Sequence, residues 1–72
     1  MHAKDLIRMA NQIAGYFASY PHDHAVAEVA SHIRDFWEPR MRHALLAHIE
    51  AGGHGLHDLV LKVATHLRAQ PA

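Results

Sequence analysis

The fold of this 72-residue chain is decided by a corner that reads Phe36-Trp37-Glu38-Pro39-Arg40-Met41-Arg42. Proline disfavours the helical conformation in the residue before it, so Glu38 marks the end of one helical segment. Proline is also favoured at the first position of a helix, so Pro39 marks the beginning of the next. The stretch therefore predicts two helices joined by a short, stiff corner.

Two helices are predicted before the corner. The nearer one begins at Asp23, a residue type that favours the N-cap, and ends at Phe36 or Trp37. Its apolar side chains recur at helical spacing and form one stripe, made of Val26, Val29, Ala30, Ile33, Phe36 and Trp37. The first helix spans Ala3–Ser19 and is apolar over roughly half of its circumference, which is more than one packing contact covers.

Two further helices are predicted after the corner. One spans Pro39–Ala51 and stops at Gly52-Gly53, because glycine readily adopts the left-handed C-cap conformation. The other spans Leu56–Ala69. No segment alternates between apolar and polar residues with a period of two, as a half-buried strand would. The sequence predicts an all-α fold, a small bundle of three to four short helices that forms a single domain over residues 1–72.

The composition narrows the classes of function. The chain has no cysteine, which excludes disulfides, thiolate metal sites and thiol nucleophiles. Seven basic residues balance seven acidic ones, so we expect no attraction to nucleic acid or to a membrane surface. A chain of this length buries only about 60% of its unfolded surface, so association with a partner, or self-association when isolated, would add stability. The charged segment Met1–Ala10 does not resemble a signal peptide, and we expect a cytoplasmic protein.

Nine histidines make a small metal-binding module one alternative. His22 and His24 are close in sequence, as are His54 and His57, and zinc or nickel accepts such ligands. Their spacing matches no established ligand set, so solvated surface histidines are the preferred interpretation, with no metal site and no cofactor in this chain.

Neither a phosphate-binding loop nor an active site is predicted. The stretch Gly52-Gly53-His54-Gly55 lacks the preceding strand and the lysine that phosphate loops require. No nucleophile has a compelling base beside it, and we expect no catalytic residue. A helix-turn-helix DNA-binding protein is a weaker alternative, because the corner lacks a glycine and the charge is neutral.

The corner is the best candidate for a partner interface. Aromatic residues, methionine and arginine are enriched in protein interfaces, and tryptophan and arginine dominate binding hot spots. Arg40 and Arg42 would lie in the first turn of a helix, where the helix dipole disfavours cations, which suggests an acidic partner. The alternative is that Phe36 and Trp37 anchor the core while the arginines pair with Asp35 and Glu38. The predicted interface, with part of the first helix, comprises Phe36, Trp37, Pro39, Arg40, Met41, Arg42, Met9 and Tyr16.

Three segments resemble one known family, the delta subunit of NAD-dependent formate dehydrogenase. They are Arg8–Ala14, the corner Phe36–Arg42 and the segment Gly52–Leu56, and they occur in the family's order. The resemblance implies an accessory subunit without an active site of its own, in a cytoplasmic molybdenum or tungsten enzyme that oxidises formate. Its partner would be the catalytic alpha subunit, and molybdopterin, iron–sulfur clusters and FMN would belong to the larger subunits. The resemblance also implies a role in assembly or stability of the complex, or in insertion of the pterin cofactor.

Overall fold

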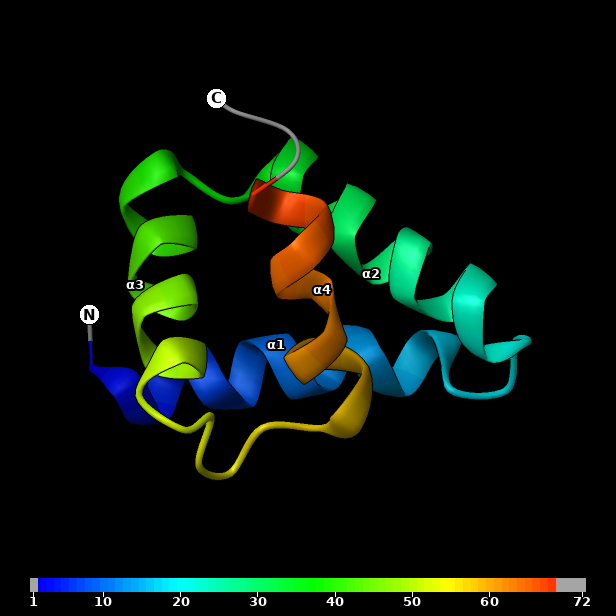
Figure 1. The fold of residues 1–72 in the computed structure, drawn as a ribbon, viewed down its shortest axis with the longest axis horizontal. Coiled ribbons are helices and arrows are strands. Elements are labelled where there is room, and N and C mark those ends of the chain that lie inside the picture. The colour runs from blue at the N-terminus through cyan, green and yellow to red at the C-terminus, as the bar shows by residue number, and fades with distance from the viewer. Residues whose placement is uncertain (1, 69–72) are drawn as a thin grey trace.

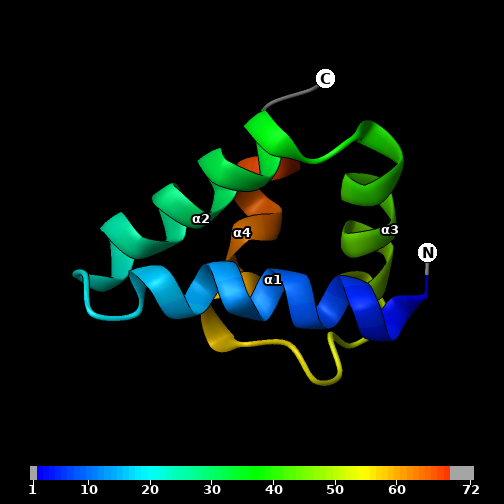
Figure 2. The ribbon, with the colours of Figure 1, turned by 180° about the vertical axis from the view of Figure 1, so that it is seen from behind.

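The computed structural model describes residues 2–68, which form four helices and no strand (Figure 1). The helices are α1 (Ala3–Phe17), α2 (His22–Phe36), α3 (Pro39–Glu50) and α4 (Asp58–Arg68). The first three form the sides of a triangle, and α4 lies across one face of it, as the two opposite views show (Figures 1 and 2). The predicted all-α bundle is confirmed.

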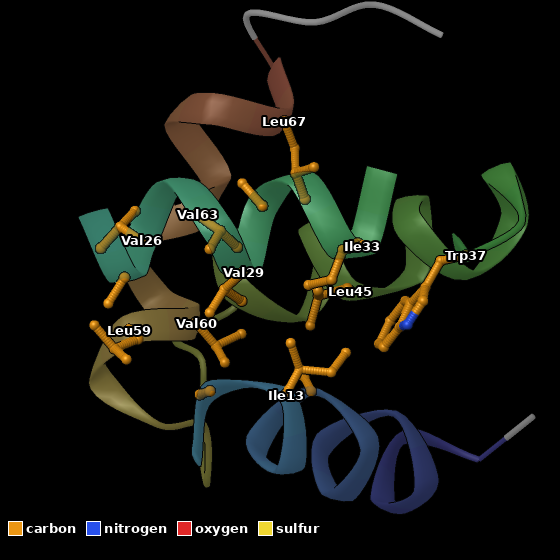
Figure 3. Close-up of a cluster of buried hydrophobic side chains, with 14 of the residues drawn as sticks. Ile13, Val26, Val29, Ile33, Trp37, Leu45, Leu59, Val60, Val63 and Leu67 are labelled. Atoms are coloured by element: carbon orange, nitrogen blue, oxygen red, sulfur yellow. The ribbon is translucent and has the colours of Figure 1, made fainter. Parts of the chain in front are cut away.

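The core forms where α2 meets α1 and α4 (Figure 3). Its largest fully buried side chains are Val29, Ile33, Leu45, Val60 and Val63. Four side chains of α1 and five each of α2 and α4 are buried, whereas α3 buries only Leu45. The third helix is therefore the one that the core anchors least.

The predicted corner between α2 and α3 is confirmed. The backbone of Trp37 is extended, with φ −92° and ψ 139°, and its N–H closes the last turn by donating to the carbonyl of Ile33. Pro39 is the first residue of α3. The steric effect of the proline ring thus ends α2 and starts α3 within three residues.

The predicted helix ends are shifted by one or two residues elsewhere. Asp23 was expected to cap α2, but the helix begins at His22 and Pro21 holds the N-cap position without a side-chain hydrogen bond. Asp23 lies instead in the first turn, where its negative charge interacts favourably with the positive end of the helix dipole. The expected end of the last helix at Ala69 lies outside the described residues. None of the described helices is both long and apolar enough to cross a bilayer.

α4 begins at Asp58, two residues after its predicted start near Leu56. The backbone N–H of Leu59 donates to Nδ1 of His57 over 3.0 Å. His57 therefore acts as the N-cap, a position at which a side-chain acceptor satisfies one of the free N–H groups of the first turn. Histidine is not among the preferred N-cap residues, so the sequence pattern did not reveal this boundary.

The loop before α4 is held to α1 by one side chain. The amide of Asn11 donates from Nδ2 to the carbonyl of Gly55 over 2.9 Å. Its Oδ1 accepts a hydrogen bond from the backbone N–H of His57 over 2.8 Å. A second contact comes from His48 of α3, whose Nε2 lies 2.8 Å from the carbonyl of His54. These three hydrogen bonds fix the loop between α1 and α3.

A glycine is required at position 53 of this loop. Gly53 has φ +67°, in the left-handed region that side chains disfavour. A Cβ atom there would also collide with the side chain of Leu61, which covers this glycine. The exposed position of Leu61 off the main stripe of α4 is explained by this contact.

Candidate partner interface

The tryptophan of the corner belongs to the core. Trp37 is 7% exposed, and its indole points toward α1 (Figure 3). It follows the last residue of α2, so the extended backbone at this position turns the side chain inward. Trp37 therefore stabilises the fold, in line with the alternative that made it a core anchor.

The neighbouring Phe36 is exposed to solvent and does not join the core. Phe36 is 75% exposed, although it lies seven residues after the fully buried Val29 and hence on nearly the same face of α2. The core ends before the last turn of the helix, so this face continues beyond its intramolecular partners. The ring of Phe36 packs against His32, with ring centroids 4.7 Å apart. The corner thus presents an aromatic surface formed by His32 and Phe36.

The two arginines of the corner and the nearby Arg34 have different roles. Arg42 donates from Nη1 to the carbonyl of Arg34 over 3.1 Å, which satisfies a free carbonyl at the end of α2. Arg34 contacts Asp35, with 3.8 Å between Nε and the carboxylate, and it donates to Ser31 over 3.3 Å. Arg40 is exposed and has no ion pair within the described residues. Arg40 is consequently the arginine that a partner can reach.

The expected ion pair between an arginine and Glu38 is absent from the described part of the chain. The carboxylate of Asp35 is paired with Arg34. The first-turn position of Arg42, which looked unfavourable for its own helix, is explained by the carbonyl of α2 beside it. At this side chain, the partial negative charge at the C-terminus of α2 offsets the partial positive charge at the N-terminus of α3.

The two methionines and the proline of the predicted interface have mixed positions. Met9 of α1 and Met41 of α3 are half-buried and pack against the core. Pro39 is exposed at the start of α3. The methionines therefore present only part of their surface to a partner.

Tyr16 is exposed but does not join the corner. Its side chain is 81% exposed in the last turn of α1. The next aromatic residues lead to the opposite end of α2, because Phe17 packs on Tyr20 and Tyr20 on His24, with centroid distances of 5.5 and 5.2 Å. A helix of the length of α2 spans about 22 Å, so the structure does not bring Tyr16 and Phe36 together.

A further feature was not evident from the sequence. A hollow of about 360 Å³ lies where the beginning of α1 meets the second half of α3. We call it the α1–α3 hollow; its lining includes Ala3, Leu6, Ile7, Ala44, Leu45, Ala47 and His48. Its two walls are about 40 residues apart in the sequence, so no local pattern predicts that they meet.

The described histidines do not gather into a metal site. No group of three histidine, aspartate or glutamate side chains in residues 2–68 is arranged to hold a metal ion. The histidines instead make separate local contacts, such as the cap by His57 and an ion-pair contact of 3.6 Å between His24 and Glu28.

Comparison with known families gives one match. The sequence model of the NADH-dependent formate dehydrogenase delta subunit FdsD matches residues 5–64. Searches of curated proteins and of solved structures found no match. The matched region includes the corner, the Asn11 contacts and most of α4.

Proposed function

Because the chain belongs to the NADH-dependent formate dehydrogenase delta subunit family, we propose that it is a non-catalytic accessory subunit that binds the catalytic alpha subunit of that enzyme. Family membership implies a formate dehydrogenase complex as the partner. Beyond this, the proposal names the alpha subunit as the partner, the surface around Phe36 as the contact, and support of the complex as the role.

The exposed ring of Phe36 is the observation that carries the proposed surface. Full burial of a phenylalanine side chain stabilises by about 1.5–3 kcal/mol, and most of this ring stays in water in the isolated chain. The core residue Trp37 fixes the backbone beside it. A partner that covers Phe36 and His32 recovers this free energy without rearranging the bundle.

Arg40 supplies the polar part of the same surface. It lies four residues after Phe36, on the exposed side of the first turn of α3. Its guanidinium and the free N–H groups of that turn both favour an anion, so a carboxylate of the alpha subunit fits beside it. Aromatic residues and arginine are both typical of binding hot spots.

The proposed role is support of the assembly or stability of the complex, or of insertion of the pterin cofactor into the alpha subunit. The chain contains no cysteine that could ligate a cluster or a pterin-bound metal through sulfur. The proposal also assigns molybdopterin, iron–sulfur clusters and FMN to the larger subunits, as the family resemblance implies. The same proposal places the chain in the cytoplasm, where it meets those subunits as they fold.

Co-expression of tagged chain and alpha subunit tests the proposed surface. Replacement of a hot-spot residue costs 2 kcal/mol or more, so Phe36→Ala should lower the affinity by about thirtyfold. Arg40→Glu should act in the same direction, whereas Lys62→Glu reverses an equally exposed charge on α4 and should leave recovery unchanged. Unfolding curves of both corner variants should match the parent chain, since neither residue supports the core.

The proposal fails if the Phe36→Ala and Arg40→Glu variants co-purify with the alpha subunit as well as the parent chain does. Formate oxidation by the complex provides the second readout. A complex assembled with the Arg40→Glu variant should have less active enzyme per alpha subunit, and normal activity would remove the assembly role.

A further inference from the structure

The side chains that line the α1–α3 hollow are mainly apolar, and the chain itself leaves this hollow unfilled. Its floor consists of Leu6 and Leu45, which are 5% and 0% exposed. Ile7 of α1 lies on one side, and Ala44 and Ala47 of α3 lie on the other. The two alanines are exposed, although they stand over a fully buried leucine. Small side chains at these positions keep the hollow open.

The size of the hollow fits side chains of a partner. Its volume of about 360 Å³ is more than twice that of a cavity of about 150 Å³ that accommodates a benzene ring. It can therefore take one aromatic or two aliphatic side chains. Among the lining residues only His48 has a polar side chain, and its Nε2 already contacts the carbonyl of His54.

The charges beside the hollow indicate the chemistry of the partner. Lys4 is exposed, directly after Ala3 and one turn before Ile7. Arg40 is exposed one turn before Ala44 on the same face of α3. Neither cation has an ion pair within the part of the chain that the structure describes. The only acidic residue of α3 is Glu50, and its carboxylate is 2.8 Å from Arg68 of α4. The rim of the hollow is thus basic.

The weak anchoring of α3 agrees with an external contact at this place. Leu45 is its only fully buried side chain, and Leu46 and Ile49 of its second half are only partly buried against the core. Figures 1 and 2 both show the end of α3 beside the beginning of α1. A side chain inserted between Ile7 and Ala47 would add apolar contacts to both helices.

We infer that the α1–α3 hollow receives a large apolar side chain from an acidic segment of another subunit, whose carboxylates contact Lys4 and Arg40. This inference rests on the proposed function, because the segment belongs to the formate dehydrogenase complex. It adds a second contact, at the beginning of α1, to the surface around Phe36. The two contacts then share Arg40 at the beginning of α3, so the bound surface would extend from Phe36 along α3 to the beginning of α1.

The absence of cysteine allows a direct test on the assembled enzyme. Single cysteines are introduced as Ala47→Cys and, as a second position in the hollow, Ala44→Cys. Ala27→Cys places the matched control on the exposed side of α2. Maleimide labelling is measured in the free chain and in the complex. Both cysteines of the hollow should react about tenfold more slowly in the complex, as expected for a water-excluding contact, while the control is unchanged.

The identity of the segment is read by cross-linking from the Ala47→Cys variant within the complex. A linked segment of another subunit that contains a large apolar residue flanked by aspartate or glutamate supports the inference. A link to a second copy of this chain, or to a segment without acidic residues, overturns it. Equal labelling of the Ala47→Cys and Ala44→Cys variants in free chain and complex overturns it as well.

The charge is tested by Lys4→Glu, with Lys62→Glu as the control. The negative charge of a glutamate in the first turn of α1 interacts favourably with the positive end of the helix dipole. This substitution should therefore not weaken the fold. It should weaken binding to the complex about tenfold because like charges then face each other, and unchanged binding contradicts the acidic partner. A chain that never enters the complex overturns the proposed function too, whereas entry without protection of the hollow overturns this inference alone.

Discussion

Asn11 accepts a hydrogen bond from the backbone N–H of His57, a residue 46 positions further along the chain. The same amide donates to the carbonyl of Gly55, so one side chain of α1 sets the path of the loop that leads into α4. The core side chains Leu59, Val60 and Val63 follow directly after this loop. The placement of α4 on the triangle of the other helices therefore depends on a polar contact made at its edge.

Replacement of Asn11 should lower the stability of the whole bundle. Asn11→Ala removes two hydrogen bonds, each with a net contribution of about 0.5–1.5 kcal/mol, so the free energy of unfolding should fall by about 1–3 kcal/mol. Urea unfolding followed by circular dichroism measures the change. Gln12→Ala is the control, because this neighbouring side chain is exposed and makes no hydrogen bond within the described residues. Equal effects of the two substitutions would show that the Asn11 contacts do not hold the loop.

Replacement of His57 should affect the start of α4. His57→Ala removes the side-chain acceptor at the N-cap and should cost about 0.5–2 kcal/mol. His57→Asp provides a carboxylate at the same position and should restore most of that stability. Thermal unfolding of the three chains gives the comparison. If His57→Asp is no more stable than His57→Ala, the imidazole does not act as a cap.

The adjacent residues Phe36 and Trp37 should differ strongly in their effect on folding. Trp37→Ala removes a buried indole, which costs about 3–5 kcal/mol. A domain of 72 residues has a total stability of about 4–11 kcal/mol, so this variant should be partly or wholly unfolded. Phe36→Ala should change stability by less than about 0.5 kcal/mol, because its ring is exposed. Circular dichroism and urea unfolding distinguish the two; a large loss of stability in Phe36→Ala would place its ring in the core.

Two glycines should respond in opposite directions to replacement by alanine. Gly15 lies within α1, and a Cβ atom added there meets no other atom within 4 Å. Gly15→Ala should therefore stabilise the fold by about 0.4–1 kcal/mol. Gly53→Ala should destabilise it by more than about 1 kcal/mol, because φ is +67° and the side chain of Leu61 covers the glycine. The shift of the unfolding midpoint measures both, and a stabilised Gly53→Ala chain would contradict the backbone conformation described for the loop.

The local parts of the fold were predictable from the sequence. Apolar periodicity and Pro39 placed α1, α2 and α3 to within about two residues, because these signals act through neighbouring residues. The exact start of α4, two residues after its predicted position, has a cause that is not local. It depends on the cap by His57 and on the contact from Asn11, which lies far away in the sequence.

The candidate site was predictable in its residue types and less so in its geometry. The corner was recognised from its aromatic and arginine content, but composition does not show that Trp37 turns inward and Phe36 outward. That difference comes from the extended backbone at Trp37, which follows the last helical residue. The roles of the arginines likewise depend on which carbonyl or carboxylate lies nearby in space, as the contact between Arg42 and the carbonyl of Arg34 shows.

The inward position of Trp37 also lowers the conformational entropy that is lost when a partner binds at Phe36. Association normally loses conformational entropy when interface side chains and their backbone become ordered, at about 0.5–1.5 kcal/mol for each immobilised side chain. Here the backbone beside Phe36 is already immobilised by a buried indole, and the phenyl ring itself rests on His32. The aromatic anchor is therefore preorganised before any partner arrives.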